Sequence, residues 1–404
     1  MQISRRGLIV LLSAMAALAP FAIDMYLPSI PQVAQHFGTS IAHIEVTISI
    51  FLIGFGIGQL VGGLFSDHYG RKPVVLIGLG TFMLASLGMI YAPSVKIMYL
   101  MRAIQAVGGG FVTVNSAAIV KDQFDKKDSA KILATVASIM MIAPMAAPMV
   151  GALIAKAGEW QLIFAFLVLY AGSLIFIMKF KVKESLTETK SLNLKKIIQG
   201  YLNIFKSRHG LGFMFSGALA TAGMFTFITK SSSIYMDYFG ASESIFPLLF
   251  GANVMTMIFL SRFSQRLIDR RSSQQIVRTG LYINLVAGSL LLLYTQWTPS
   301  PALAVIVGLN MAFIGSLGFV YGHIDSCFLT YYPKSTGTAN SIFGVTRFSI
   351  GATTGAIVAW LGNDPIHSPF IVMFGCTALA NLIFLFMTPG TKSKQIFQGI
   401  LAKV

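Results

Sequence analysis

The feature that most constrains this chain is a series of twelve apolar runs, each about 20 residues long or longer. Such a run can cross the hydrocarbon core of a membrane as one helix. Because the backbone in hydrocarbon must satisfy its own hydrogen bonds, the runs predict helices rather than open sheet. We therefore predict an all-α polytopic membrane protein with twelve transmembrane helices. The runs lie at about residues 8–28, 44–65, 74–92, 97–119, 132–155, 161–179, 210–236, 245–267, 276–295, 301–329, 338–360 and 369–388.

Composition and charge support a membrane protein. Hydrophobic residues make up 55% of the chain and charged residues only 11%, against about 25% charged in soluble domains. The net charge of +16 would suggest a nucleic-acid partner in a soluble protein. Here 25 of the 30 basic residues fall on one side of the twelve predicted spans, and only Lys96 and Lys156 fall on the other. This asymmetry predicts that both termini lie in the cytoplasm, and the positive-inside bias of a membrane explains the net charge without a nucleic-acid partner.

The longest polar stretch divides the predicted spans into six and six. It predicts an N-terminal six-helix bundle at residues 1–180, a cytoplasmic linker at 181–209 and a C-terminal six-helix bundle at 210–404. A weak repeat supports this division, since the polar triplet beginning at Ser66 has a counterpart beginning at Ser264. Two repeated halves are typical of transporters whose site lies between them near the membrane midplane.

Two charges in the N-terminal spans need a reason, because a charge at the bilayer centre costs about 2.5–3.5 kcal/mol. Asp24 stands near the end of the first span, in Asp24-Met25-Tyr26-Leu27-Pro28. It is either an interfacial residue that reaches water or a protonatable carboxylate of a substrate cavity. Arg102 lies early in the fourth span, one turn before Gln105. It either extends to the membrane surface or points inward, where its charge tunes the proton affinity of nearby carboxylates.

The loop between the second and third spans carries more than basic residues. It reads from Gly63 to Pro73 and contains Asp67, Gly70 and Arg71. Gly70 permits a tight turn, while Asp67 can cap a helix and pair with Arg71 or with a base on a neighbouring helix. Such a pair could hold one face of a transporter shut.

Glycine and proline spacing marks two further helices. The second span has glycines at positions 54, 58 and 62, which predict a small-residue face for close helix packing. The fifth span contains Pro144, Pro148 and Gly151. Two prolines four residues apart remove two amide donors and bend a helix, so a purely lipid-facing role is disfavoured.

Together these stretches resemble the major facilitator superfamily, and within it the drug–proton antiporters of the bicyclomycin/chloramphenicol resistance type. The resemblance covers the whole chain by topology, but its specific motifs lie in the N-terminal half. It implies alternating access, with Asp67 and Arg71 in an inner gate and with Asp24 and Arg102 in proton coupling. The fifth-helix motif from Pro144 to Gly151 would favour export over import. Three positions depart from the motifs, namely Phe65, His68 and Ala106.

The C-terminal spans carry charges that such a family does not require. Lys230 lies in the seventh span, Asp325 in the tenth beside His323, and Arg347 in the eleventh. Lys230 and Asp325 could form an ion pair across the cavity, either as a purely structural pair or beside the cargo. Otherwise the extra positive charge suggests a polar or anionic cargo.

These observations favour a proton-coupled exporter of small organic molecules, with drugs as the first candidate cargo. The alternative is a dedicated exporter of an anionic or zwitterionic metabolite such as a siderophore. An enzyme is disfavoured, because the chain has no zinc-protease, nucleophile-elbow or phosphate-loop motif. We expect no metal, no catalytic residue and no cofactor, with protons as the coupling ion and a monomer in the lipid bilayer. The expected substrate cavity contains Asp24, Tyr26, Gln105, Lys230, His323, Asp325 and Arg347.

Overall fold

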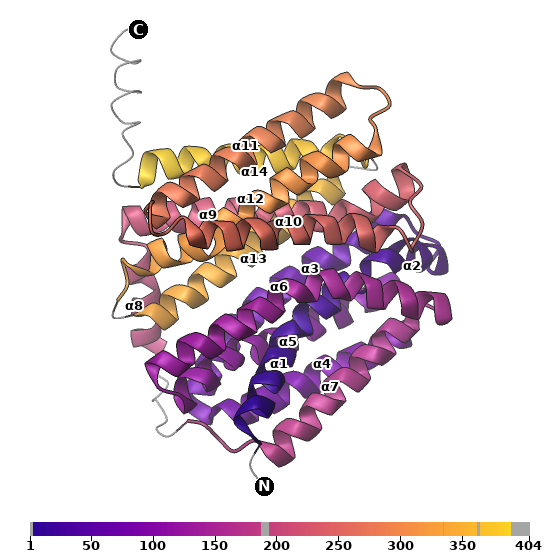
Figure 1. Ribbon diagram of the computed structural model, residues 1–404. Coiled ribbons are helices and arrows are strands. Elements are labelled where there is room, and N and C mark those ends of the chain that lie inside the picture. Colours follow the sequence, from indigo (N-terminus) through magenta and orange to yellow (C-terminus); the bar gives the residue numbers. More distant parts are fainter. Residues whose placement is uncertain (1–2, 187–193, 334, 362–363, 389–404) are drawn as a thin grey trace, which may run out of the picture. The chain divides into compact units, whose positions relative to one another are not determined.

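The computed structural model describes residues 3–186, 194–333, 335–361 and 364–388. In this part of the chain every regular element is a helix (Figure 1). The elements are α1 (Arg5–Asp24), η1 (Leu27–Ser29), α2 (Ile30–His36), α3 (Ile41–Tyr69), α4 (Arg71–Ile90), α5 (Val95–Gln123), α6 (Lys126–Ala157), α7 (Gln161–Lys181), α8 (Leu194–Ile204), α9 (Arg208–Ser232), η2 (Ser233–Tyr238), α10 (Phe246–Arg266), α11 (Ser273–Trp297), α12 (Leu303–Leu329), α13 (Thr336–Trp360) and α14 (Ser368–Met387).

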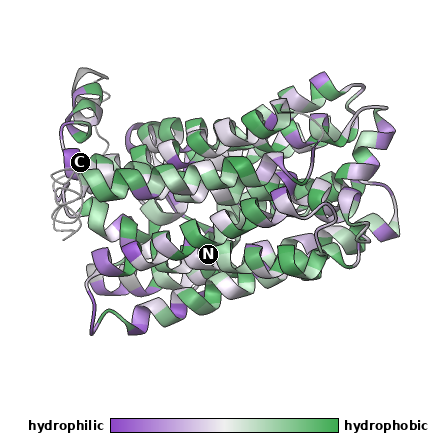
Figure 2. Cartoon of the chain, turned by 90° about the horizontal axis from the view of Figure 1, so that it is seen from above, coloured by the Kyte–Doolittle hydropathy of each residue, from purple (hydrophilic) through white to green (hydrophobic). Residues whose placement is uncertain are grey.

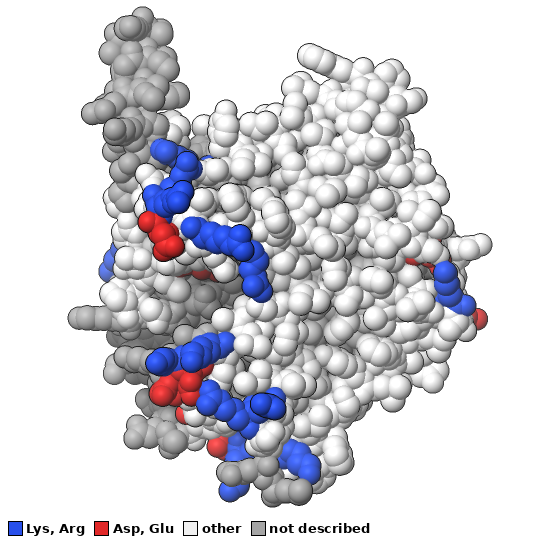
Figure 3. Space-filling model, in the orientation of Figure 1, with Lys and Arg blue, Asp and Glu red and all other residues white. Residues whose placement is uncertain are grey.

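Twelve helical stretches among the described residues are long and apolar enough to cross a membrane. They follow the twelve predicted runs one for one, so the predicted fold class is confirmed. Along the helices the residues are mostly hydrophobic, and hydrophilic residues concentrate toward the helix ends (Figure 2). Charged side chains on the face shown in Figure 3 gather toward its edges and leave the surface between them almost uncharged. An uncharged band of this kind suits contact with lipid chains.

The chain forms two compact units. The first comprises residues 1–192, 228–254 and 355–365, and the second comprises 193–227, 255–354 and 366–404. The end of α9, η2 and the first part of α10 therefore belong to the same unit as α1 to α7. The units do not follow a single chain break at residues 181–209, and the division at that linker stays a prediction.

In the first unit, the small-residue face of α3 packs directly against α5. A side chain added at Gly54, Gly58 or Gly62 would meet backbone or side-chain atoms of α5. These contacts confirm the predicted small-residue packing face. The α5 residues concerned are Ala103, Val107 and Phe111, which follow Arg102 along the same helix.

In the second unit, α11 packs closely on α12. Gly280 leaves room for Phe319, whose Cβ would lie 2.7 Å from a Cβ added to that glycine. One turn on, the Asn284 Nδ2 donates to the carbonyl of Phe313 at 2.9 Å. This bond satisfies a polar group that would be costly to leave unpaired inside the bundle.

Candidate functional site

Asp24 is the last residue of α1 and is buried, with 4% of its surface exposed. Within the described part of the chain, no group donates a hydrogen bond to its carboxylate or pairs with it. The interpretation of Asp24 as an interfacial residue that reaches water is therefore wrong. A buried carboxylate without a counter-charge is costly to keep ionised.

Arg102 is fully buried and points into the first unit. Its Nη2 donates to the carbonyl of Ala22 at 2.8 Å, and its Nη1 donates to Gln105 Oε1 at 2.7 Å. Gln105 Nε2 in turn donates to the hydroxyl of Ser86 at 2.8 Å. This chain of hydrogen bonds joins α5 to α4 and to α1, where the acceptor Ala22 lies two residues before Asp24. The alternative that Arg102 extends to the membrane surface is therefore wrong.

Aromatic rings surround the Arg102 guanidinium where a carboxylate would be expected. Its Cζ lies 4.9 Å from the ring centroid of Tyr26, 5.1 Å from that of Phe51 and 5.7 Å from that of Phe164. Such contacts stabilise a cation in a dry setting by about 2 kcal/mol each when desolvated. The structure thus brings Tyr26, Arg102 and Gln105 into contact and places Asp24 two residues after the Ala22 carbonyl that Arg102 binds, while a substrate cavity at these residues stays a prediction.

The fifth-span motif packs on the first-span motif. Pro144 and Pro148 lie inside α6, which continues as a helix through both. Gly151, one turn later, lies directly against the backbone of Met25. The residue that follows Asp24 therefore contacts the predicted antiporter motif.

The loop motif between α3 and α4 forms ion pairs and hydrogen bonds within the first unit. The Arg71 guanidinium pairs with Asp67. Its Nε donates to Asp122 Oδ2 at 2.9 Å, and its Nη1 donates to the Ser66 hydroxyl at 2.7 Å. Gly70 has a backbone φ of 99°, a value that residues other than glycine rarely adopt. Gly63 lies one helical turn before Asp67, and its carbonyl accepts from the Ser66 hydroxyl at 3.0 Å. The predicted pair of Asp67 and Arg71 is present, and its role as a gate stays a prediction.

Glu184 anchors the same turn to the segment after α7. Its two carboxylate oxygens accept the backbone N–H groups of Arg71 at 2.9 Å and Lys72 at 3.0 Å. A carboxylate at this end of α4 also meets the positive end of the helix dipole. Lys72 Nζ returns two bonds to carbonyls at the end of α7, which fixes α4 relative to α7.

Lys230 forms an ion pair with Glu45 of α3. Its Nζ lies 2.9 Å from Glu45 Oε2, and the side chains are 2% and 0% exposed. The hydroxyl of Ser233 donates to Glu45 Oε1 at 2.6 Å. The prediction that Lys230 pairs with Asp325 is therefore wrong, because Lys230 pairs with Glu45 of α3.

Asp325 pairs with Arg347 in the second unit. Arg347 Nη2 donates to Asp325 Oδ1 at 2.7 Å, while the guanidinium stacks on the rings of Tyr321 and Phe343 at 4.9 and 4.4 Å. His323 is near in sequence but contacts the Ser264 hydroxyl through its Nε2 at 3.1 Å. Both cations that suggested an anionic cargo thus have a carboxylate partner.

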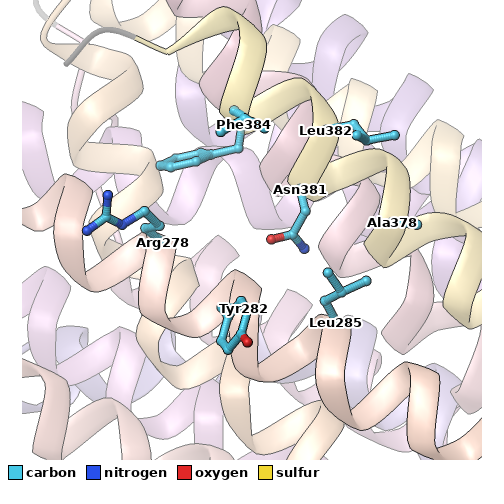
Figure 4. A pocket seen from close by; sticks show the side chains of 8 residues that line it. Arg278, Tyr282, Leu285, Ala378, Asn381, Leu382 and Phe384 are labelled. Atoms are coloured by element: carbon cyan, nitrogen blue, oxygen red, sulfur yellow. The ribbon is translucent and has the colours of Figure 1, made fainter. Parts of the chain in front are cut away.

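Two cavities adjoin these helices. One of about 430 Å³ lies between α11 and α14, and Figure 4 shows Arg278 and Tyr282 on one side and Asn381 and Phe384 on the other. It contains none of the predicted site residues. The other, of about 330 Å³, is more polar and lies in the first unit. Its lining residues are Thr39, Ser40, Ile41, Ala42, Lys230, Ser233, Asp237 and Pro365.

Three acidic residues in these contacts were absent from the sequence prediction. Glu45 stands inside the apolar run at 44–65, where any charge needs a partner, and this signal could have identified it. Asp122 and Glu184 stand among basic residues in polar segments and carry no such signal.

Comparison with known proteins identifies the family. The pattern described as Major Facilitator Superfamily matches residues 12–356. The chain is 30% identical to the bicyclomycin resistance protein homolog of Haemophilus influenzae, over 94% of this chain and 96% of that one. It is 28% identical to a chloramphenicol resistance protein of Pseudomonas aeruginosa, over 93% and 88%. A solved D-xylose–proton symporter shares the fold, with a TM-score of 0.75 and 16% identity over 95% of this chain and 98% of that one. The chain therefore belongs to the major facilitator superfamily and is a multi-pass membrane transporter rather than an enzyme.

Proposed function

We propose that this protein exports drug-like organic molecules through a bacterial inner membrane in exchange for protons. Both termini lie in the cytoplasm, the protein acts as a monomer without a cofactor, and transport proceeds by alternating access. The observation that carries the proposal is the buried, unpartnered carboxylate of Asp24 at the end of the helix whose Ala22 carbonyl accepts from Arg102. The names of the relatives support drugs as cargo, since they are resistance proteins for bicyclomycin and chloramphenicol.

Asp24 suits proton exchange because its environment penalises the charged form. With no partner in the described structure, the carboxylate is stable inside the protein only as the neutral acid. When water or a cationic cargo reaches it, the charged form becomes favourable and the proton leaves. Arg102 holds the end of α1 through the carbonyl of Ala22, so a change at Asp24 is passed to α5.

Export of an anionic metabolite such as a siderophore has less support. Lys230 and Arg347 motivated that alternative, but Glu45 and Asp325 neutralise them. An anionic cargo would have to displace a carboxylate before it could use either cation.

The test uses purified protein in liposomes with an imposed pH gradient and a pH-reporting dye inside. Tetraphenylphosphonium, chloramphenicol and an anionic iron chelator are added in turn. We expect proton flux with the first two in the wild type and none in Asp24→Asn. Glu159→Gln, an exposed carboxylate substitution in the loop after α6, is the matched control and should behave as wild type. Full flux in Asp24→Asn would refute its coupling role, and flux only with the chelator would refute drug export.

A further inference from the structure

The pair formed by Glu45 and Lys230 takes no part in the mechanism proposed above. Both side chains are almost completely buried, and the Ser233 hydroxyl also donates to Glu45. Removing two charges from water costs several kcal/mol per ion, and apolar side chains of similar size often stabilise a protein as well or better. Stability therefore does not explain a charged pair at this place, and a functional role is the default for ionisable groups inside a membrane.

The cavity of about 330 Å³ gives this pair access to water. Lys230 and Ser233, which both contact Glu45, form part of its wall. A polar cavity of this size holds several water molecules, because one water occupies about 30 Å³ in the liquid. A proton can therefore reach the partners of Glu45 without crossing the apolar interior.

Unlike Glu45, the carboxylate residue Asp237 is part of the cavity wall. Asp237 is exposed, lies in η2, and has no ion-pair or hydrogen-bond partner within the described residues. Asp237 comes after Lys230 in the sequence and lies within the π-helical segment Ser233–Tyr238. Turns of π-helix occur frequently at functional sites. Lys230 pairs with Glu45 and shares the cavity wall with Asp237. The ammonium of a lysine sits on a flexible four-carbon stem, which allows it to change partner.

We propose that Glu45 is a second proton-binding site, at which a proton and the ammonium of Lys230 compete for one carboxylate. The proposal rests on proton coupling as proposed above. Without the proton, Glu45 is paired with Lys230 as the structure shows. A proton delivered by cavity water forms the neutral acid, which keeps its bond from Ser233. The ammonium keeps its own proton and turns to Asp237. One proton is bound in total, and loss of that proton restores the first pair.

The signals of other titratable groups near the cavity must be distinguished from the signal of Glu45. His43 on α3 is exposed and shares a 2.7 Å hydrogen bond with the Ser40 hydroxyl. Tyr99 of α5 donates to the carbonyl of His43 at 2.6 Å. Asp364 precedes Pro365, which lines the cavity. His43→Gln is included as a background control.

The experiment is infrared difference spectroscopy on the purified full chain between about pH 5 and pH 9, following the C=O stretch of protonated carboxylic acids. We expect two titrating acid bands in the wild type and in His43→Gln. Asp24→Asn removes one band and Glu45→Gln removes the other. Because Glu45→Gln leaves Lys230 buried without a counter-charge, the double variant Glu45→Gln/Lys230→Met tests the same loss in a charge-balanced protein.

Partner exchange is tested through Asp237. Asp237→Asn should shift the midpoint of the Glu45 band to lower pH by about one unit, because Lys230 then has nowhere else to go. In a Lys230→Met background the same substitution should leave the midpoint unchanged. An equal shift in both backgrounds would refute partner exchange, since it would show a direct field from Asp237.

The outcomes separate this proposal from the proposed function. If neither Glu45→Gln nor the double variant loses an acid band, the second proton site is overturned, whatever the result for Asp24→Asn. A band lost in the Glu45 variants but not in Asp24→Asn would uphold the second site and remove the coupling role of Asp24.

Discussion

The contact between Gly151 and Met25 gives the sharpest test of how the two predicted motifs act together. Replacing Gly151 by Ala adds one methyl group to α6 at the point where it lies on the end of α1. The new Cβ would overlap the carbonyl oxygen of Met25 and lie 2.8 Å from its carbonyl carbon and 2.9 Å from its Cα. All three are backbone atoms, so no side-chain rotation can relieve the overlap.

The size of the effect follows from that geometry. Inserting a methyl group into a packed interior typically costs about 1–3 kcal/mol, and here α6 must move away from α1 or bend. Gly375→Ala is the matched control, because it lies inside α14 and a Cβ there meets nothing within 4 Å. Alanine should stabilise that helix by about 0.5–1 kcal/mol, since glycine loses more conformational freedom on folding.

The assay is thermal unfolding in detergent followed by tryptophan fluorescence, together with transport in liposomes. We expect Gly151→Ala to melt several degrees below Gly375→Ala and to transport more slowly, because Met25 adjoins Asp24. Equal melting temperatures for the two variants would show that α6 and α1 do not pack as described, and the reasoning would be wrong.

Four further substitutions test individual contacts. Arg102→Lys should reduce transport at least tenfold, because an ammonium cannot bond Gln105 and Ala22 in the same fork and stacks less well on the rings; normal liposome transport would contradict this. Glu184→Gln should lower the free energy of unfolding by about 0.5–1 kcal/mol through the lost charge at the start of α4, measured by denaturant in detergent, and no change would contradict the cap. Asp325→Asn should destabilise the wild-type protein more than it destabilises the Arg347→Gln variant, because the variant has already lost the ion pair. Strictly additive losses of unfolding free energy in this double-mutant cycle would refute the pair.

The helices were predictable from the sequence because their signal is local. Each apolar run has the length of a membrane crossing, and no distant partner is needed to make it helical. The contact of Arg102 with Tyr26 and Gln105 also agrees with the sequence, since two motifs of one family carry these residues.

The partners of the charged residues could not be predicted in the same way. Lys230 pairs with Glu45, 185 residues earlier, rather than with Asp325. A pairing of this kind depends on how far each helix is displaced along and rotated about its axis, and one helical turn shifts a side chain by about 5.4 Å. Hydropathy predicts that a helix exists, but it gives neither the displacement of the helix along its axis nor its rotation about that axis. Glu184 could not be foreseen for another reason, because its partners are backbone N–H groups that carry no sequence signal.

The balance of buried charge leads to a prediction about the cargo. Lys230 is matched by Glu45 and Arg347 by Asp325, whereas Asp24 has no counter-charge in the described part of the chain. A cationic cargo can supply that charge, and it then competes with the proton for the same carboxylate. Linkage requires that the proton weaken cargo binding as much as the cargo weakens proton binding. Low pH favours the neutral acid, so tetraphenylphosphonium should bind the purified protein at least tenfold more weakly at about pH 6 than at about pH 8. In Asp24→Asn the affinity should be low and independent of pH, while Glu159→Gln should keep the wild-type dependence. A pH-dependent affinity that persists in Asp24→Asn would place the competition at another group, with Glu45 the next carboxylate to test.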